Sequence, residues 1–186
     1  MPALPMALQD LPERCVFEGH RFNLRFGHGA NMSFARATFE RVGLFDELLG
    51  AGAPLRSWPE RDLGYRVLTA GGRIVYTPAA SVVHYHWRDW PQVKRTYRNY
   101  AIGTGAAVGK YLRYGDRVAV QLLLEWLWSQ GVRQMVSGAL KWRYWHKVVV
   151  GAMQLVYPFV GLWQGARYPL SAEHWVYLPK KEKERV

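Results

Sequence analysis

The sequence predicts a mixed α/β domain followed by membrane-associated α-helices, and three observations support this prediction. Residues 1–87 alternate β-rich runs with short helical patterns, and they carry nine Arg against eight acids, a net charge of +1. Residues 88–186 carry sixteen Lys and Arg against six acids, a net charge of +10, and eight of the nine Trp residues lie at or after Trp87. Residues 148–166, nineteen in all, contain no charge. The predicted parts are an α/β domain, a basic helical region and a disordered tail (residues 1–88, 89–179 and 180–186).

The first part is predicted to contain short elements separated by glycine and proline. An extended lead-in (residues 1–20) is followed by an interrupted strand (22–34), a short helix (38–42) and a loop (44–56). A second helix (57–70) comes next, and then two short strands or one broken strand (73–76 and 80–84). Gly43 stands where the first helix should end, because glycine readily adopts the left-handed backbone found at helix C-termini. Gly71 and Gly72 are expected to end the second helix in the same way.

The helix near Ser57 has the clearest start signal. Ser57 is a favoured N-cap residue, Pro59 suits the first turn, and Glu60 lies three residues after Ser57, which is the spacing of a capping box. This start places the acidic side chains of Glu60 and Asp62 at the positive end of the helix dipole. These acids either stabilise the helix or act on a ligand.

The basic part is predicted to consist of helices that meet an anionic membrane surface. Residues 92–114 form one helical pattern after a cap at residues 89–91, and residues 118–128 are nearly all apolar. The interleaved basic and aromatic residues are typical of nucleic-acid binding, of a membrane surface or of simple solubility. The long apolar runs, and the lack of a recognised nucleic-acid-binding motif, favour the membrane over nucleic acid. The basic residues expected to face anionic headgroups are Lys94, Arg95, Arg98, Lys110, Arg113 and Arg117.

The uncharged window at residues 148–166 is close in length to the roughly twenty residues that span a membrane. Pro158 and two glutamines weaken a straight span, and Pro158 should kink a helix here. Three interpretations stay open: a helix at the membrane surface or re-entrant in it, a full span, and an ordinary core helix. The Gly161-x-x-x-Gly165 spacing is too short a signal to predict helix pairing.

Cysteine content and the N-terminal residues predict the compartment. Cys15 is the single cysteine, which excludes an intramolecular disulfide and a multi-cysteine metal site and suits a reducing compartment. The first residues lack the charged start and the unbroken apolar run of a signal peptide. We therefore expect the chain on the cytoplasmic side of the cell membrane.

The stretch from residue 29 to residue 86 resembles a known family. Several short segments occur in the order and spacing of the second half of the catalytic domain of family 2 glycosyltransferases: 29–36 (GANMSFAR), 42–47 (VGLFDE), 50–54 (GAGAP), 60–66 (ERDLGYR), 71–78 (GGRIVYTP) and 83–86 (VHYH). Each segment alone is a weak signal, but their shared order and spacing are a strong one. The resemblance covers roughly residues 25–88.

The resemblance implies a GT-A fold, a mixed α/β domain that binds a nucleotide-sugar donor and a divalent metal, Mg²⁺ or Mn²⁺. Such enzymes transfer the sugar to a hydroxyl of a glycan, polysaccharide or lipid-linked acceptor, usually with inversion, and inversion needs a general base beside the attacking hydroxyl. The family places an acidic pair shortly before the position of Asp62, and the second acid of that pair corresponds to Glu60. Glu60 is therefore the predicted base, and Asp62 is the second predicted catalytic residue, which holds the loop or the acceptor.

The resemblance also implies ligand contacts for other residues. His84 matches a position at which a histidine approaches the metal or the diphosphate, so it is the predicted metal ligand. The predicted substrate-binding residues are Gly29, Ala30, Asn31, Trp58 and His86. Structural interpretations stay open beside these, namely a strand bulge at Gly29 and a purely structural role for His84. Residues 45–47 are expected to be structural, with Phe45 packed and the acids capping a turn.

The sequence departs from the family pattern in two respects. Pro59 occupies the position of the first acid, and Glu60 stands where the family has aspartate; a base misplaced by about 1 Å costs on the order of a hundredfold in rate. No Asp-x-Asp metal motif occurs, and the residues before the match are fewer than the roughly thirty that a nucleotide-binding βαβ unit needs. We therefore expect the chain to be a C-terminal portion of such an enzyme. The alternative is a non-catalytic remnant or an accessory membrane-associated piece.

Overall fold

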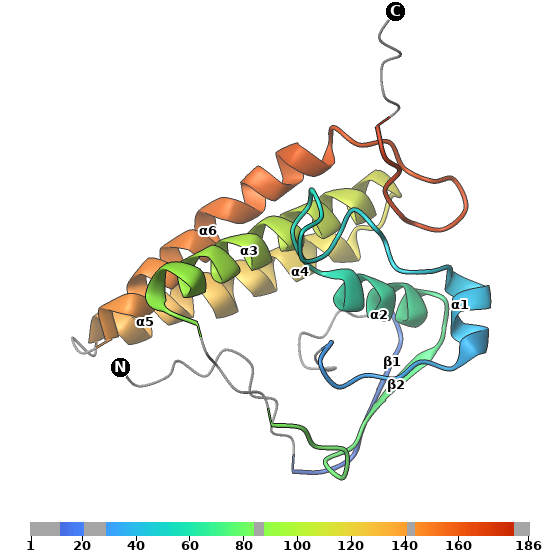
Figure 1. Cartoon of the computed structure of the whole chain (residues 1–186), viewed down its shortest axis with the longest axis horizontal. Coiled ribbons are helices and arrows are strands. Elements are labelled where there is room, and N and C mark those ends of the chain that lie inside the picture. The colour runs from blue at the N-terminus through green and yellow to red at the C-terminus, as the bar shows by residue number, and fades with distance from the viewer. Residues whose placement is uncertain (1–11, 21–28, 84–87, 141–143, 181–186) are drawn as a thin grey trace, which may run out of the picture. The chain divides into compact units, whose positions relative to one another are not determined.

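Helices make up most of the regular structure in the computed structural model of this chain, which describes residues 12–20, 29–83, 88–140 and 144–180 (Figure 1). The chain divides into two compact units. Unit 1 comprises Met1–Phe45 and Glu60–Asp89, and unit 2 comprises Asp46–Pro59 and Trp90–Val186. The loop Asp46–Pro59, which the sequence placed in the first domain, thus groups with the basic helical part.

The sheet of unit 1 consists of two short antiparallel strands. Strand β1 (Cys15–Glu18) pairs with β2 (Arg73–Tyr76) in a register that sets Cys15 opposite Tyr76 and Glu18 opposite Arg73. Both strands alternate half-buried and exposed residues, as expected of a strand with one covered face. β2 was predicted, but β1 lies inside the segment predicted to be an extended lead-in.

Unit 1 also contains two helices, and both end at a glycine, as the sequence predicts. Helix α1 (Arg36–Val42) stops at Gly43, whose φ is 78° and whose N–H donates to the carbonyl of Phe39. Helix α2 (Pro59–Thr69) ends with Gly71 at φ 74°, where the amide of Gly72 donates to the carbonyl of Val67 over 2.8 Å. This six-to-one hydrogen bond is the Schellman motif. A cluster of apolar side chains from both helices forms the core, with Val42, Leu63 and Val67 buried at its centre and Phe34, Phe39, Ala70 and Ile74 around them.

The fold prediction is right only in part. The structure is mostly helical with one small antiparallel sheet, and the described residues contain no sheet of the GT-A type. The strand predicted for residues 80–84 is wrong for its described residues, 80–83, because a turn at Thr77 takes the chain away from β2 and the carbonyl of Ala80 accepts a side-chain amide instead of a strand partner. In the predicted strand at 22–34, residues 29–34 form no strand, and residues 22–28 lie outside the described residues.

The predicted N-cap of α2 is also wrong. The helix starts at Pro59, and the Ser57 hydroxyl donates to the carbonyl of Asn99 over 3.0 Å. The amide of Ser57 donates to the carbonyl of Leu55, so neither bond of a capping box forms at this residue. Trp58, which lies between Ser57 and Pro59, has a φ of 86°. This backbone conformation turns the chain into the helix one residue later than the capping pattern requires.

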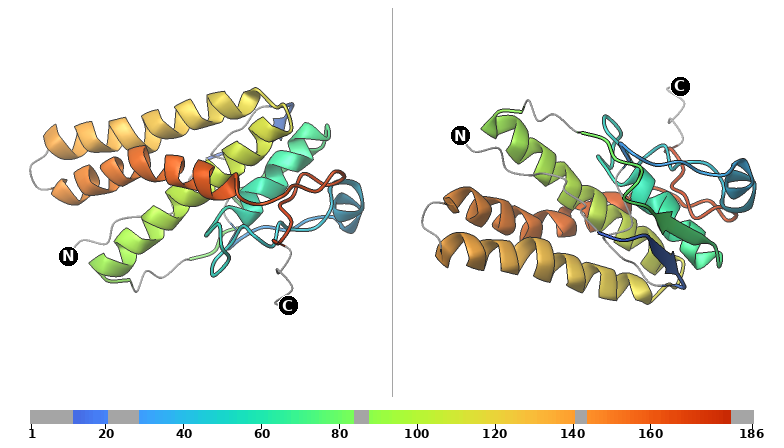
Figure 2. Two further views of the ribbon diagram at one scale, coloured as in Figure 1. Left: turned by 90° about the horizontal axis from the view of Figure 1, so that it is seen from above. Right: turned by 90° about the horizontal axis from the view of Figure 1, so that it is seen from below.

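Unit 2 is built on three lengths of helix that lie side by side (Figure 2). The first is α3 (Trp90–Arg113), and the third is α6 (Trp145–Gly165). The second runs without interruption through α4 (Val118–Trp126), the π-helical η1 (Leu127–Val132) and α5 (Arg133–Leu140). Helix α6 packs along α3 and along η1 and α5, so it is in contact with both of the other lengths. The helical character predicted for this part is therefore confirmed.

Small residues let α3 and α6 approach closely. A Cβ atom at Gly105 would lie 1.7 Å from the carbonyl oxygen of Pro158, and one at Gly161 would lie 1.9 Å from the carbonyl oxygen of Ile102. Neither position can hold a larger residue unless the backbones separate. The Gly161–Gly165 spacing, which the sequence alone did not support as a pairing signal, thus lies at the contact between the two helices. Helix α6 continues through Pro158, whose carbonyl faces this contact.

One buried amide links all three lengths of helix in unit 2. Gln154 of α6 is 1% exposed; its Nε2 donates to the carbonyl of Tyr97 over 2.9 Å, and its Oε1 accepts the indole N–H of Trp126 over 3.1 Å. Gln154, which was expected to weaken a membrane span, is a polar bridge with satisfied hydrogen bonds in a helical core.

Burial raises the pKa of the Tyr97 phenol above its ordinary value, and the nearby Tyr100 raises it further.

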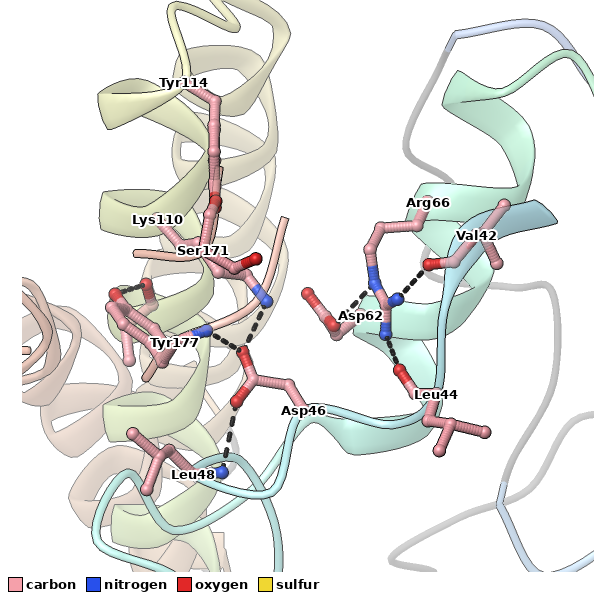
Figure 3. A network of polar contacts seen from close by, with 11 residues as sticks. Val42, Leu44, Asp46, Leu48, Asp62, Arg66, Lys110, Tyr114, Ser171 and Tyr177 are labelled. Carbon is pink, nitrogen blue, oxygen red and sulfur yellow. Dashed lines mark hydrogen bonds and ion pairs between the residues drawn. The ribbon is translucent and has the colours of Figure 1, made fainter. Parts of the chain in front are cut away.

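A buried ion pair joins the loop Asp46–Pro59 to α3 (Figure 3). Lys110 Nζ lies 2.8 Å from Asp46 Oδ2, and both side chains are 0% exposed. The same carboxylate accepts the amide of Tyr177 over 2.9 Å, and its other oxygen accepts the amide of Leu48 over 3.1 Å. The structural role predicted for Asp46 is confirmed, and the three donors satisfy a charge that would otherwise be costly to bury.

Lys110 is the one basic residue whose predicted surface role is wrong. It was expected to face anionic headgroups, but its side chain is fully buried against Asp46 and lies between the rings of Tyr111 and Tyr177, 5.6 Å from each ring centroid. The sequence suggested a surface residue because Lys110 belongs to a strongly basic segment; its partner is 64 residues away.

The segment after α6 folds back along α3. Leu170 and Tyr177 form an isolated antiparallel bridge, and the Tyr177 hydroxyl donates to the carbonyl of Ala106 over 2.7 Å. The Tyr114 hydroxyl donates to the carbonyl of Ser171 (Figure 3). The ring of Tyr114 stacks on that of Trp175, with 5.0 Å between the ring centroids. Leu49, Leu55, Ala106 and Tyr177 form the apolar core that these contacts enclose.

Candidate functional site

The predicted base lies in the first turn of a helix in unit 1. Glu60 is the second residue of α2, and its side chain is half-buried. The N-terminus of a helix presents unpaired backbone N–H groups and a positive partial charge, so an acidic side chain here also stabilises the helix. A general base must in addition be accessible to the acceptor hydroxyl, and Glu60 is partly accessible.

Two of the predicted site segments come together at Glu60. A Cβ atom at Gly29 would lie 3.0 Å from Cδ and 3.3 Å from Oε1 of Glu60, so the backbone at Gly29 approaches this carboxylate closely. Gly29 and Ala30 are exposed. The side-chain amide of Asn31 donates to the carbonyl of Ala80 over 2.8 Å, which ties the segment to the loop after β2. The segment at Gly29 is therefore a close neighbour of the candidate base, and the predicted substrate contacts of Gly29, Ala30 and Asn31 stay predictions.

Asp62 lies on the same helix but in a different environment (Figure 3). Its carboxylate is 0% exposed and accepts the Nε–H of Arg66 over 3.1 Å. The guanidinium of Arg66 also donates to the carbonyl of Val42 and, over 2.7 Å, to the carbonyl of Leu44. The Asp62–Arg66 pair therefore connects α2 to the end of α1. The Asp62 carboxylate is paired inside the unit, whereas the Glu60 carboxylate is partly accessible.

Trp58 belongs to unit 2 and is buried there. Its side chain is 3% exposed, and its ring lies 5.8 Å from that of Trp126 at an angle of 59°. This packing gives the indole a structural role in unit 2. The predicted substrate contact of Trp58 stays a prediction.

The two predicted histidines lie outside the described residues. These are His84, the predicted metal ligand, and His86, a predicted substrate-binding residue. Within the described part of the chain, no three His, Cys, Asp or Glu side chains converge as a metal site requires. Of the two acidic side chains in the first turn of α2, Glu60 is partly accessible, whereas Asp62 is buried and paired with Arg66.

Two further features of unit 1 were not predicted. His20 Nε2 lies 3.0 Å from the hydroxyl of Tyr65, a buried residue of α2, and the two rings meet edge to face. No local pattern could have indicated this pair, because 45 residues separate its members. An open depression of about 580 Å³ is lined by Glu18, Gly19, Gly71, Gly72 and Arg73, none of which is a predicted site residue.

Comparisons with protein-family models, with curated proteins and with solved structures find no match for this chain.

Proposed function

We propose that this chain forms the acceptor side of a family 2 type glycosyltransferase, in which Glu60 is the general base of an inverting transfer. The observation that carries the proposal is the ordered set of family-like segments between residues 29 and 86. The structure adds support, because the first of these segments approaches the carboxylate of Glu60 at Gly29. The donor is a nucleotide-sugar, and the acceptor is a hydroxyl of a glycan, polysaccharide or lipid-linked sugar.

The proposed reaction is a single displacement. The carboxylate of Glu60 accepts the proton of the acceptor hydroxyl as the acceptor oxygen attacks the anomeric carbon of the donor sugar. A new bond forms between that oxygen and the anomeric carbon, and the bond from the anomeric carbon to the diphosphate oxygen breaks. The nucleoside diphosphate leaves with the bonding electrons, and attack from the opposite face inverts the anomeric centre.

Asp62 is a positioning residue in this proposal. Its carboxylate is bound by Arg66, which also holds the carbonyls of Val42 and Leu44. These contacts orient the first turns of α2, and a base works only within about an ångström of its correct place. The divalent metal that the resemblance implies would need donors beyond the described residues, and His84 is the candidate that the sequence offers.

Glu60→Gln tests the proposal. The full chain is produced in cells, membranes from these cells supply the acceptor, and label is followed from a panel of nucleoside-diphosphate sugars into polysaccharide and lipid fractions. We expect Glu60→Gln to lower transfer by about 10²-fold or more, because the amide cannot accept the proton. Glu60→Asp should retain part of the activity, since it keeps a carboxylate at the position where the family has aspartate.

Glu40→Gln is the matched control. Glu40 is an exposed glutamate on α1 of the same unit, 3.7 Å from Arg36, and its loss should leave transfer within about twofold of the wild type. Equal activity in Glu60→Gln and Glu40→Gln would remove Glu60 from the mechanism. If the wild-type chain transfers no sugar from any donor, the second candidate, a non-catalytic accessory piece, takes its place; Pro59 in place of an acid and the internal pairing of Asp62 favour that candidate.

A further inference from the structure

Helix α6 exposes a row of large apolar side chains. Val156 is 60% exposed, Phe159 53% and Trp163 57%. The spacings of three and four residues place all three on one face of the helix. The opposite face is packed, with Gln154, Pro158 and Gly161 buried against the other helices of unit 2. One side of helix α6 therefore belongs to the core of unit 2, and the other side is apolar and exposed.

The exposed face has no charge along its length and a cation, Arg167, at its C-terminal end. Residues 148–166 contain no charged side chain, and Lys147 and Arg167 border them. The guanidinium of Arg167 lies 3.3 Å from the centroid of the Trp163 ring, and Lys147 Nζ lies 5.2 Å from that of Tyr144. An apolar strip with a basic and aromatic end is complementary to an anionic lipid surface, where acyl chains lie just below phosphate groups.

Helix α6 is also, by length and hydropathy alone, the one helix among the described residues that could cross a membrane, with a mean hydropathy of 1.3. Its neighbours in unit 2 argue against crossing. Arg98 on α3, Glu125 on α4 and Arg133 on α5 are all exposed. Each lies about four residues, or roughly 6 Å, from the middle of its helical length. If α6 crossed the bilayer with its packed partners, these charges would enter the hydrocarbon, where charged side chains are strongly disfavoured.

We propose that α6 lies in the plane of an anionic membrane surface, with Val156, Phe159 and Trp163 inserted among the acyl chains and Arg167 against lipid phosphates. This docking surface involves unit 2 only. It stands or falls independently of sugar transfer, because none of its residues belongs to the candidate site in unit 1.

Vesicle binding by the full chain tests the apolar face. The probe is a set of vesicles made of phosphatidylcholine and phosphatidylglycerol in equal amounts, and the measurement is the partition coefficient from co-sedimentation. Phe159→Glu should lower it about tenfold or more, because a charge replaces an inserted ring. Leu44→Glu is the matched control; Leu44 is a 71% exposed residue of unit 1, and its variant should bind within about twofold of the wild type. Equal losses in both variants would overturn the proposal.

A second variant tests the basic end. Arg167→Gln should lower the partition coefficient about threefold to fivefold on the mixed vesicles. It should not change binding to vesicles of phosphatidylcholine alone. Arg36→Gln is the control, since Arg36 is a 95% exposed cation of α1 and lies in unit 1. If Arg36→Gln weakens binding as much as Arg167→Gln does, the chain binds through its overall charge, and the proposal fails.

Insertion depth separates docking in the plane from crossing. In a Cys15→Ser background, a polarity-sensitive fluorophore is attached to Val156→Cys or to Trp163→Cys. Quenching by lipids that carry a quencher at a known depth then measures the depth of each label in the bilayer. We expect the two labels at the same shallow depth. A label at residue 156 near the bilayer centre, with one at residue 163 nearer the surface, would show a span and overturn docking in the plane.

Self-association is the remaining alternative use of the face. Sedimentation velocity without lipid should show a monomer for the wild type and for Phe159→Glu. A wild-type dimer that Phe159→Glu converts to a monomer, with no change in vesicle binding, would assign the face to a second copy of the chain and overturn the proposal. Circular dichroism of each variant checks that the helices are intact.

Discussion

The two units bury an ion pair each, and the two pairs are built differently. In unit 1, Asp62 and Arg66 lie four residues apart on one helix. In unit 2, Asp46 and Lys110 lie 64 residues apart, on a loop and a helix. The first spacing is one that a helical pattern brings together by itself, whereas the second exists only once the loop has packed against α3. The comparison shows that a buried ion pair can be predicted from the sequence when its two residues are close in the chain, and not when they are far apart.

The largest expected effect comes from breaking the non-local pair. Lys110→Met keeps most of the length of the side chain but leaves the Asp46 carboxylate buried without its cation, so the free energy of unfolding should fall by about 4 kcal/mol. Urea unfolding followed by Trp fluorescence measures this loss. Asp46→Asn should restore part of it in the double variant, because the remaining oxygen still accepts backbone N–H groups. Lys94→Met is the control, since Lys94 lies 5.8 Å from the Trp90 ring on the same helix and has no carboxylate partner in the described contacts; its cost should stay below about 1 kcal/mol. Equal losses would contradict the importance of the pair.

The packing of α3 on α6 gives the next largest effect. Gly105→Ala places a methyl group 1.7 Å from the carbonyl oxygen of Pro158, so the helices must separate at a cost of about 3 kcal/mol. Gly109→Ala is the matched control on the same helix. Its Cβ would lie 3.2 Å from the Leu162 side chain, which can move, and alanine is a better helix former than glycine. We expect Gly109→Ala to change the free energy of unfolding by less than about 1 kcal/mol; a larger loss there than at Gly105 would contradict the close contact.

The local pair of unit 1 predicts a smaller loss. Arg66→Lys keeps the positive charge but cannot reach Asp62 and the carbonyls of Val42 and Leu44 together, so the free energy of unfolding should fall by about 2 kcal/mol. Arg36→Lys, at an exposed position of α1, should change it by less than about 0.5 kcal/mol. If the two variants lose the same amount, the fork of Arg66 contributes nothing that a point charge does not.

The smallest effect is a dependence on pH in unit 2. The pKa of Tyr97 is raised in the folded chain by burial and then by Tyr100, so the folded state binds the phenolic proton more tightly than the unfolded state. The stability that this supplies is complete below the unfolded pKa of about 10 and is lost as the pH rises above it. Stability should therefore fall more steeply above pH 10 in the wild type than in Tyr97→Phe. Parallel curves for the two proteins would contradict burial of the phenol.

The sequence by itself determined the features that depend on residues close together in the chain. Gly43 and Gly71 end their helices because glycine takes a positive φ at low cost. Trp90 and Pro91 start α3 close to the predicted cap, and the charge-free window became α6. The capping box at Ser57 was one local prediction that failed, because Ser57 bonds to Asn99 of α3 instead. Here a tertiary contact replaced a local hydrogen bond of similar strength.

Tertiary structure alone decided the features that join distant residues. It paired β1 with β2, buried Lys110 against Asp46, satisfied Gln154 between three helical lengths and brought Gly29 to Glu60. It also decided which side of the uncharged helix stays open, since Val156, Phe159 and Trp163 are as apolar as the residues that pack. Local patterns depend on backbone preferences and on neighbours within four residues, which are written in the sequence. Burial and pairing depend on which surfaces meet after folding, and that choice belongs to the whole chain.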